Sequence, residues 1–182
     1  MMVRPWPLIA SEQIFGTGLF RVTRDRACSP RTGEVRNFDV VHMVDWLLVV
    51  PLTIDGRLVL VRQYRHGSRE AGLEVPGGLH DAADARPEEG AARELAEETG
   101  YGDGELVLLG ELRPQPALLS NRACIYLAKN VQRLSEPKLD AGEDIDVVLI
   151  DRCEVPARIG AGEITNAMTI AALGLARFGG HL

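Results

Sequence analysis

Cysteine is scarce in this sequence, and the way it is used excludes two classes of protein. The 182 residues include three cysteines, Cys28, Cys124 and Cys153. Their number is odd and their spacing is wide, with no C-x-x-C pair and no histidine at ligand spacing. Neither a disulfide framework nor a cysteine-based metal site is therefore expected. Residues 1–10 also lack the charged and apolar regions of a secretory signal, so we expect a reducing, cytoplasmic location.

Long apolar runs and basic charge are lacking as well. The apolar run at residues 46–52 is far shorter than the ~20 residues that a helix needs to cross a bilayer. We interpret it as a core strand and expect no membrane partner. The formal net charge is −6, and binding to nucleic-acid phosphates usually needs a basic face, which argues against nucleic acid as a partner. An anionic substrate would need a metal ion and arginine side chains.

Acidic residues, by contrast, stand at helical spacing near the middle of the chain. Residues 93–100, Arg-Glu-Leu-Ala-Glu-Glu-Thr-Gly, predict the end of a helix that stops at Gly100. On such a helix Glu94, Glu97 and Glu98 share one face. Because three carboxylates repel one another, the face either points to water or is neutralised by a divalent cation. Hard oxygen ligands of this kind suit Mg²⁺ or Mn²⁺.

The residues before this helix favour the second alternative, an acidic face that is neutralised by a divalent cation. Residues 73–79, Leu-Glu-Val-Pro-Gly-Gly-Leu, are strand-like but contain a proline and two glycines, which brings bare backbone close to the start of the helix. Residues 78–101 resemble the Nudix box, whose pattern is G-x5-E-x7-R-E-U-x-E-E-x-G-U, where U is aliphatic or aromatic. The positions that match its second half are Arg93, Glu94, Leu95, Glu97, Glu98, Gly100 and Tyr101.

The first half of the box departs from the family pattern in two ways. Arg93 follows Gly78 by fifteen positions instead of fourteen, so the loop carries one extra residue. The usual loop glutamate is missing, and Asp84 is the nearest acidic residue in its place. Asp84 alternatively serves as the N-cap of a helix that begins at Pro87. Since the loop glutamate is a supporting residue in the family, its absence bears on loop rigidity more than on the metal site.

The resemblance implies a role for each residue of the box. Glu94 and Glu98 are expected to ligate Mg²⁺ or Mn²⁺ directly, and the backbone carbonyl of Gly77 is expected to complete the inner shell. Glu97 is expected to serve catalysis by sharing or positioning a second ion. Arg93 is expected to orient a ligand glutamate with its guanidinium fork. The alternative for Arg93 is an exposed arginine paired at helical spacing.

The resemblance extends over roughly residues 38–176 and points to one branch of the family. Residues 61–67, Val-Arg-Gln-Tyr-Arg-His-Gly, and residues 162–169, Gly-Glu-Ile-Thr-Asn-Ala-Met-Thr, are similar to enzymes that hydrolyse ADP-ribose and other nucleoside diphosphate sugars. This implies a Mg²⁺-dependent pyrophosphohydrolase that releases a nucleoside monophosphate and a sugar phosphate. Two alternatives stay open, a hydrolase of free nucleoside triphosphates and a non-catalytic module that binds a nucleotide sugar.

Four residues are candidates for contacts with that substrate. Their spacing of three on a strand allows at most one of Arg62 and Arg65 to reach the site, and we expect Arg65 to contact phosphate. A surface ion pair is the alternative for Arg65. Trp46 either stacks on a base or ribose or lies in the core. Arg122 is expected to meet a substrate phosphate, in a segment where relatives carry an acidic residue and this chain has none.

The general base is expected in an acidic loop after the box. Related sugar-nucleotide hydrolases draw a catalytic glutamate from such a loop, and here the loop is residues 140–146, Asp-Ala-Gly-Glu-Asp-Ile-Asp. Glu143 is therefore our candidate. An exposed, solvated turn is the alternative, because Gly142 and the charge density both suit it.

The order of predicted elements fits the α/β/α sandwich (class α/β, or α+β) that the Nudix resemblance implies, with a mixed sheet and helices on its faces. Residues 14–23 and 35–43 are expected to form an N-terminal antiparallel strand extension. Residues 46–54 and 58–64 are expected to form a hairpin across Asp55-Gly56.

We therefore expect a single Nudix hydrolase domain over residues 1–182. Its catalytic core would be residues 45–182. The resemblance implies that the strand region at residues 1–44 exchanges across a two-fold homodimer.

Overall fold

The computed structural model describes residues 2–182, which form two compact units. The first unit runs to Val44 and includes the later segment Arg113–Arg122. The second unit consists of Asp45–Leu112 and Ala123–Leu182. Within the described part of the chain, no helix is long and apolar enough to cross a membrane.

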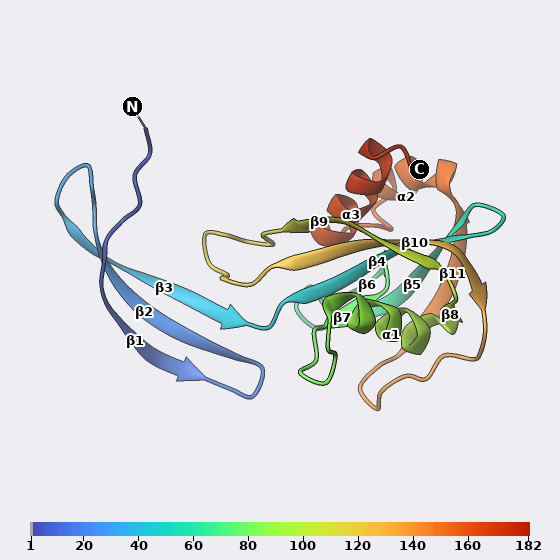
Figure 1. The fold of residues 1–182 in the computed structure, drawn as a ribbon, viewed down its shortest axis with the longest axis horizontal. Helices are drawn as coiled ribbons and strands as arrows, with labels where there is room; N and C mark the ends of the chain where they lie inside the picture. Colours follow the sequence, from blue (N-terminus) through green and yellow to red (C-terminus); the bar gives the residue numbers. More distant parts are fainter. Residues whose placement is uncertain (1) are drawn as a thin grey trace. The chain divides into compact units, whose positions relative to one another are not determined.

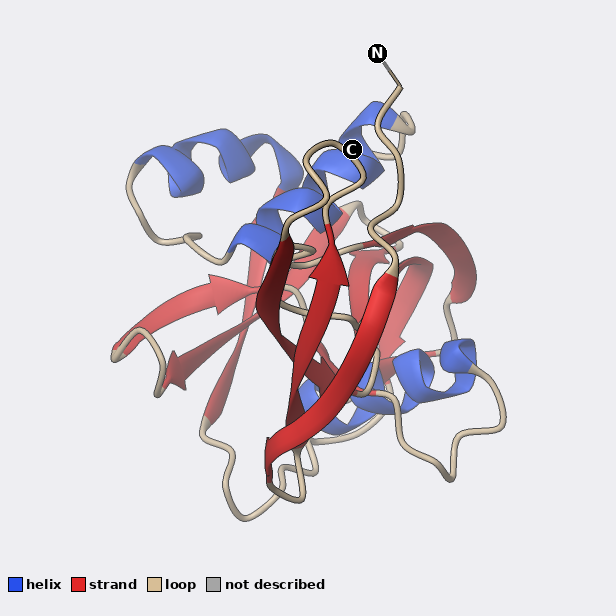
Figure 2. Cartoon of the chain, turned by 90° about the vertical axis from the view of Figure 1, so that its left-hand side faces the viewer, coloured by secondary structure: helices blue, strands red, loops and turns tan. Residues whose placement is uncertain are grey.

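The first unit is built on a three-stranded antiparallel sheet of β1 (Leu8–Gly16), β2 (Phe20–Cys28) and β3 (Val35–Met43), with β2 in the middle (Figure 2). The predicted antiparallel extension is confirmed, but the prediction of one continuous strand over residues 14–23 is wrong, because these residues belong to β1, a turn and β2. The turn divides the predicted strand, because the Thr17 hydroxyl accepts the N–H groups of Leu19 and Phe20. Such local side-chain bonds offer the backbone an alternative to the strand ladder.

The segment Arg113–Arg122 lies along the outer edge of β3. The N–H of Val41 donates to the carbonyl of Leu118 at 2.9 Å, and the N–H of Ser120 donates to the carbonyl of Val41 at 3.1 Å. The imidazole of His42 lies 2.9 Å from the hydroxyls of both Thr23 and Ser120. This segment therefore covers one edge of the sheet, while the outer edge of β1 has no strand partner among residues 2–182.

The second unit contains a mixed sheet of eight strands in the described chain, ordered β11-β5-β4-β10-β8, with β6 on β5, β7 on β4 and β9 on β10. Only β10 and β4 run parallel among these pairs. The strands are β4 (Trp46–Thr53), β5 (Arg57–Arg65), β6 (Glu70–Glu74), β7 (Gly77–Leu79), β8 (Tyr101–Gly102), β9 (Glu105–Leu112), β10 (Ala123–Arg133) and β11 (Ile145–Asp151). The helices are α1 (Pro87–Thr99), α2 (Val155–Gly160) and α3 (Ala167–Phe178), with a 3₁₀ turn η1 (Arg152–Glu154) before α2.

Helices cover both faces of this sheet, α1 on one and α2 with α3 on the other (Figure 1). Along β4, Leu47 and Val49 pack in one core cluster with Leu95 of α1. Leu48 and Val50 pack in the other cluster with residues of α3. Successive side chains of a strand point to opposite faces, and both faces here are covered, so the strand is apolar throughout. The predicted sandwich is confirmed.

Helix α1 begins and ends as its sequence predicts. It starts at Pro87, and the preceding Arg86 makes no side-chain capping bond. Asp84 is therefore not the N-cap. The helix stops at Gly100, which has φ 71° and donates its N–H to the carbonyl of Ala96 at 2.9 Å. A Cβ added at Gly100 would clash with the carbonyl oxygen of Ser135, so both its φ and its surroundings require glycine.

Candidate active site

The inner face of α1 carries a buried carboxylate, Glu98, which is 3% exposed. The N–H of Gly77 donates to its Oε2 at 2.8 Å. Gly77 begins β7 and pairs with Leu48 of β4. A Cβ at Gly77 would clash with the carbonyl oxygen of Leu47, so only glycine allows the two backbones to come this close. That close approach presents the Gly77 amide to Glu98.

Glu94 lies one turn earlier on the same helix, against the next glycine. A Cβ added at Gly78 would lie 2.5 Å from the carboxyl carbon of Glu94 and 2.6 Å from both of its oxygens. The Glu94 side chain is 13% exposed. The two glycines therefore leave room for two carboxylates beneath the turn into β7.

These two carboxylates are held where their charge is poorly solvated. Burial raises the pKa of Glu98 to about 8, and the negative charges of Glu94 and Glu143 add to the shift, whereas the Gly77 N–H opposes it. Burial also raises the pKa of Glu94, with Arg93 opposing. Without a cation, burial and mutual repulsion both disfavour the charged forms. Two hard oxygen donors in this state fit a divalent cation of the Mg²⁺ type.

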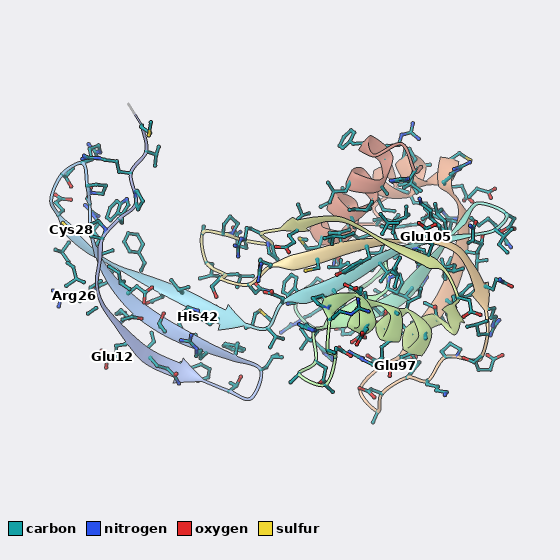
Figure 3. The ribbon with its side chains drawn as sticks, viewed as in Figure 1. Glu12, Arg26, Cys28, His42, Glu97 and Glu105 are labelled. Carbon is teal, nitrogen blue, oxygen red and sulfur yellow. The ribbon has the colours of Figure 1, made fainter. Side chains whose placement is uncertain are left out.

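Glu97 is more exposed than the other two glutamates of the motif. Its side chain is 43% exposed and accepts a hydrogen bond at 2.8 Å from Arg93, four residues earlier on α1 (Figure 3). Within residues 2–182, no three histidine, cysteine, aspartate or glutamate side chains are grouped closely enough to hold a metal ion. The structure thus brings Glu94 and Glu98 inward, while the second-ion role of Glu97 stays a prediction.

Arg93 links the helix to the loop before it. Its Nε and Nη2 donate to the two carboxylate oxygens of Asp84 at 3.2 and 3.0 Å. Its Nη1 lies 2.8 Å from Glu97 and 3.0 Å from Glu94. The Asp84 side chain is 9% exposed, and the hydrogen bonds from Arg93 lower its pKa. One guanidinium therefore holds three carboxylates, which fits the orienting role predicted for Arg93.

Glu143 lies within electrostatic range of the helix carboxylates. It is exposed, and its Oε2 accepts the N–H of Asp140 at 2.9 Å. Its negative charge contributes to raising the pKa values of Glu94 and Glu98. The acidic loop is therefore an exposed turn, as the alternative for Glu143 has it, and the general-base role of Glu143 stays a prediction.

Both arginines predicted on β5 are paired with carboxylates. Arg65 donates from Nε and Nη2 to Glu74 at 3.0 and 2.8 Å, so it forms the ion pair that the sequence analysis gave as its alternative role. Its partner, however, is buried rather than on the surface. Arg62 is half-exposed, and its Nη2 lies 3.7 Å from Glu163.

The last two predicted substrate contacts lie in different units. Trp46 is half-buried at the start of β4 and packs against the core cluster on the α3 side. This is the core position that the sequence allowed as its alternative. Arg122 is exposed and belongs to the first unit. The substrate roles of both residues stay predictions.

Comparison with known proteins decides the family. The NUDIX domain model matches residues 42–166. The chain belongs to the Nudix family. It is 30% identical to the ADP-ribose pyrophosphatase of Mycobacterium tuberculosis over 164 residues, which are 90% of this chain and 79% of that protein. It is 26% identical to the ADP-ribose pyrophosphatase of Bacillus subtilis over 166 residues, 91% of this chain and 89% of that protein.

A solved structure supports the Nudix fold over the whole chain. The crystal structure of an ADP compounds hydrolase superposes with a TM-score of 0.85, at 23% identity, and the match covers 100% of both chains. The family resemblance inferred from the box and the predicted fold class are both confirmed.

Both departures of this Nudix box concern the loop around Asp84. Asp84 follows Gly78 by six positions, as the glutamate does in the family pattern, so the extra residue lies between Asp84 and Arg93. Asp84 still reaches Arg93 with both oxygens. An aspartate is one methylene shorter than a glutamate, and we attribute its reach to the longer loop.

Sequence reasoning missed two residues near this site, Glu74 and Asn166. Glu74 is buried and accepts hydrogen bonds from Arg65 and from Asn166. One signal for Glu74 was present, since a charged residue in an apolar strand needs a buried partner. No local pattern marks the bond from Asn166 to Glu74, because the two residues lie 92 positions apart.

Proposed function

We propose that this Nudix protein is a divalent-metal-dependent pyrophosphohydrolase of ADP-ribose or another nucleoside diphosphate sugar. It cleaves the diphosphate to a nucleoside monophosphate and a sugar phosphate. The observation that carries the proposal is the inward pair of Glu94 and Glu98 beneath the glycine turn at Gly77. The two relatives named ADP-ribose pyrophosphatase support the substrate class.

The box residues divide the work of the site. Glu94 and Glu98, with the carbonyl of Gly77, would hold Mg²⁺ or Mn²⁺, which neutralises phosphate charge and polarises water when bound. Arg93 keeps Glu94 in place through its Nη1, and Asp84 keeps Arg93 in place. A charged ligand that is oriented in this way loses little freedom on binding.

Glu143 is the proposed general base, with Glu97 supporting catalysis beside it. An exposed carboxylate in a loop has free lone pairs with which to accept a proton from the attacking water. Its negative charge is among the causes that raise the pKa values of Glu94 and Glu98, which supports the proposal.

Substrate contacts are proposed for Arg65, Arg62, Arg122 and Trp46. Arg65 is the best supported, because two of the five donor hydrogens of an arginine go to Glu74 and its side chain is half-exposed. The remaining donors suit a phosphate group.

We also propose that the protein is a homodimer that uses its first unit. Large apolar side chains are exposed there, among them Leu8, Ile9, Phe15 and Val35. Exposed apolar patches and unpaired strand edges are typical of association surfaces. A cytoplasmic location is likewise proposed, in keeping with the free thiols of Cys28, Cys124 and Cys153.

A substrate panel tests the proposed reaction. Release of monophosphate is measured from ADP-ribose, from ADP-, GDP- and UDP-linked sugars, and from nucleoside triphosphates, each with Mg²⁺ and with a chelator. We expect chelator-sensitive cleavage of a sugar nucleotide. Cleavage of triphosphates alone would replace the proposed substrate class. Thermal stabilisation by a nucleotide sugar without any cleavage would indicate a binding module.

A further inference from the structure

The cap of helix α3 has a second bond that capping does not require. The Oδ1 of Asn166 accepts the N–H groups of Met168 at 2.9 Å and Thr169 at 3.1 Å, as an N-cap does. Its Nδ2 donates to Oε2 of Glu74 at 2.9 Å. The same carboxylate oxygen accepts from Arg65 at 2.8 Å. Asn166 therefore ties the start of α3 to the end of β6.

Thr169 makes the neighbouring bond one turn into the same helix. Its hydroxyl accepts the N–H of Val75 at 3.2 Å, and the exposed fractions of the two residues are 0% and 3%. Val75 lies between β6 and β7, so no ladder partner serves its N–H. A buried N–H without a partner costs free energy, and the Thr169 hydroxyl supplies the acceptor that the backbone around Val75 does not.

Both contacts end immediately before the turn that meets the helix carboxylates. After Glu74 and Val75 comes Pro76, whose carbonyl accepts the N–H of Val49 at 2.9 Å. Gly77 follows, and its N–H donates to Glu98. Only Pro76 separates the residue held by Thr169 from the amide that holds Glu98, and its ring fixes its own φ. Little freedom remains by which Gly77 could move independently.

We propose that Thr169 and Asn166 are positioning residues for the divalent-metal site. They act at a distance in sequence, by anchoring Val75 and Glu74 so that the Gly77 amide meets Glu98 and Glu98 keeps its orientation. This inference rests on the proposed function and adds helix α3 to its machinery. Neither side chain touches substrate or metal in this scheme.

Direct binding of Mn²⁺ to the protein, followed by electron paramagnetic resonance, tests the role of Thr169. Thr169→Val removes the acceptor and keeps the shape of the side chain, whereas Thr169→Ser keeps the acceptor. We expect Mn²⁺ to bind about fivefold more weakly to Thr169→Val, the factor that corresponds to one net hydrogen bond of about 1 kcal/mol. Thr169→Ser should bind as the unaltered protein does.

Thr53→Val is the matched control. Thr53 is also a buried threonine, and its hydroxyl donates to Asp55 and accepts the N–H of Arg57 at 2.9 Å. It lies at the far end of β4, five residues beyond Leu48, which pairs with Gly77. Thr53→Val should lower the Tm as Thr169→Val does, without weakening Mn²⁺ binding. Equal Mn²⁺ affinities in the two variants would overturn the proposal, as would a wild-type protein that binds no Mn²⁺.

Asn166→Ser is the second variant, and it decides the question if Thr169→Val does not fold. Serine keeps the cap of α3 but cannot reach Glu74. We expect weaker Mn²⁺ binding again, and a higher Mg²⁺ requirement for cleavage. Wild-type affinity in a folded Asn166→Ser protein would remove Asn166 from the scheme. If the wild type binds Mn²⁺ but cleaves no member of the substrate panel, the proposed function fails while the Mn²⁺ comparison still tests the positioning.

Discussion

Glu98 is the buried carboxylate of the site, and its surroundings disfavour its charged form. It is almost fully buried, its main hydrogen-bond partner is a backbone amide, and a second carboxylate lies nearby. Burying a charged carboxylate without a cation costs free energy, so the charged form of Glu98 destabilises the metal-free fold. The same burial holds its oxygens in place as ligands for a cation. Replacing its charge should therefore separate activity from stability.

Glu98→Gln should lower turnover by several orders of magnitude and leave the fold intact or more stable. The amide removes a charged ligand, and it also removes the cost of burying a charge. Steady-state kinetics and thermal melts without metal check both effects. Glu105→Gln is the control, because Glu105 is an exposed glutamate at the start of β9 (Figure 3). Near-normal turnover in Glu98→Gln would refute the assignment of Glu98 as a ligand.

The pKa of Glu98 predicts how the stability of the metal-free protein depends on pH. Its folded pKa is raised to about 8 from an ordinary value of 4.5, so the folded state binds the proton more tightly than the unfolded state does. The resulting stabilisation is complete below pH 4.5 and is lost as pH rises through about 8. Melting curves in chelator should show a Tm that falls over this window in the wild type more steeply than in Glu98→Gln. Parallel curves would contradict the shift.

Asp84→Asn should lower kcat/KM by about 10- to 100-fold, the usual effect of losing a partner that orients a metal ligand. Arg93 would keep Glu97 but lose its bidentate anchor in the loop. Asp55→Asn is the control, because Asp55 pairs with Arg57 on the surface and asparagine keeps an oxygen that can accept from the Thr53 hydroxyl. Equal activity in the two variants would show that the loop anchor is dispensable.

At the scale of elements, the loop before α1 is one residue longer than the family pattern and carries an aspartate in place of a glutamate, and we infer that the two changes are matched. Lengthening the side chain by Asp84→Glu should disturb the contact with Arg93, because the loop already reaches it with aspartate. Deleting Ala85 together with Asp84→Glu restores the family spacing and should recover most of the kcat/KM that the single substitution loses. Kinetics of the single and double variants check this coupling. Strictly additive losses would refute the compensation.

At the scale of the molecule, the first unit exposes apolar side chains on a sheet whose β1 edge has no strand partner in the described part of the chain. We expect a dimer at micromolar concentration by light scattering. Phe15→Glu should give a monomer, since it places a charge on β1 among exposed apolar residues. Ile54→Glu is the control, because Ile54 is exposed at the β4–β5 turn of the second unit. A monomeric wild type would overturn the proposed dimer.

The sequence by itself determined those features whose causes lie close together in the chain. Helical spacing marked Glu94 and Glu98, and Gly100 marked the helix end. The Asp55-Gly56 dipeptide marked the β4–β5 hairpin, and the Pro-Gly-Gly run marked a close backbone approach. Each depends on local geometry and on residue types that a few neighbours constrain. Family membership was likewise inferred from a short motif, the Nudix box at residues 78–101.

Only the tertiary structure decided which partner each polar group finds. It paired Arg65 with Glu74, turned Glu97 toward Arg93, and used Asp84 as an anchor instead of a cap. It also joined Asn166 to a strand 92 residues earlier. A buried polar group must have a partner, but its identity depends on which side chains the folded sheet and helices bring within about 3 Å. That proximity is a property of the packed chain, and no local pattern encodes it.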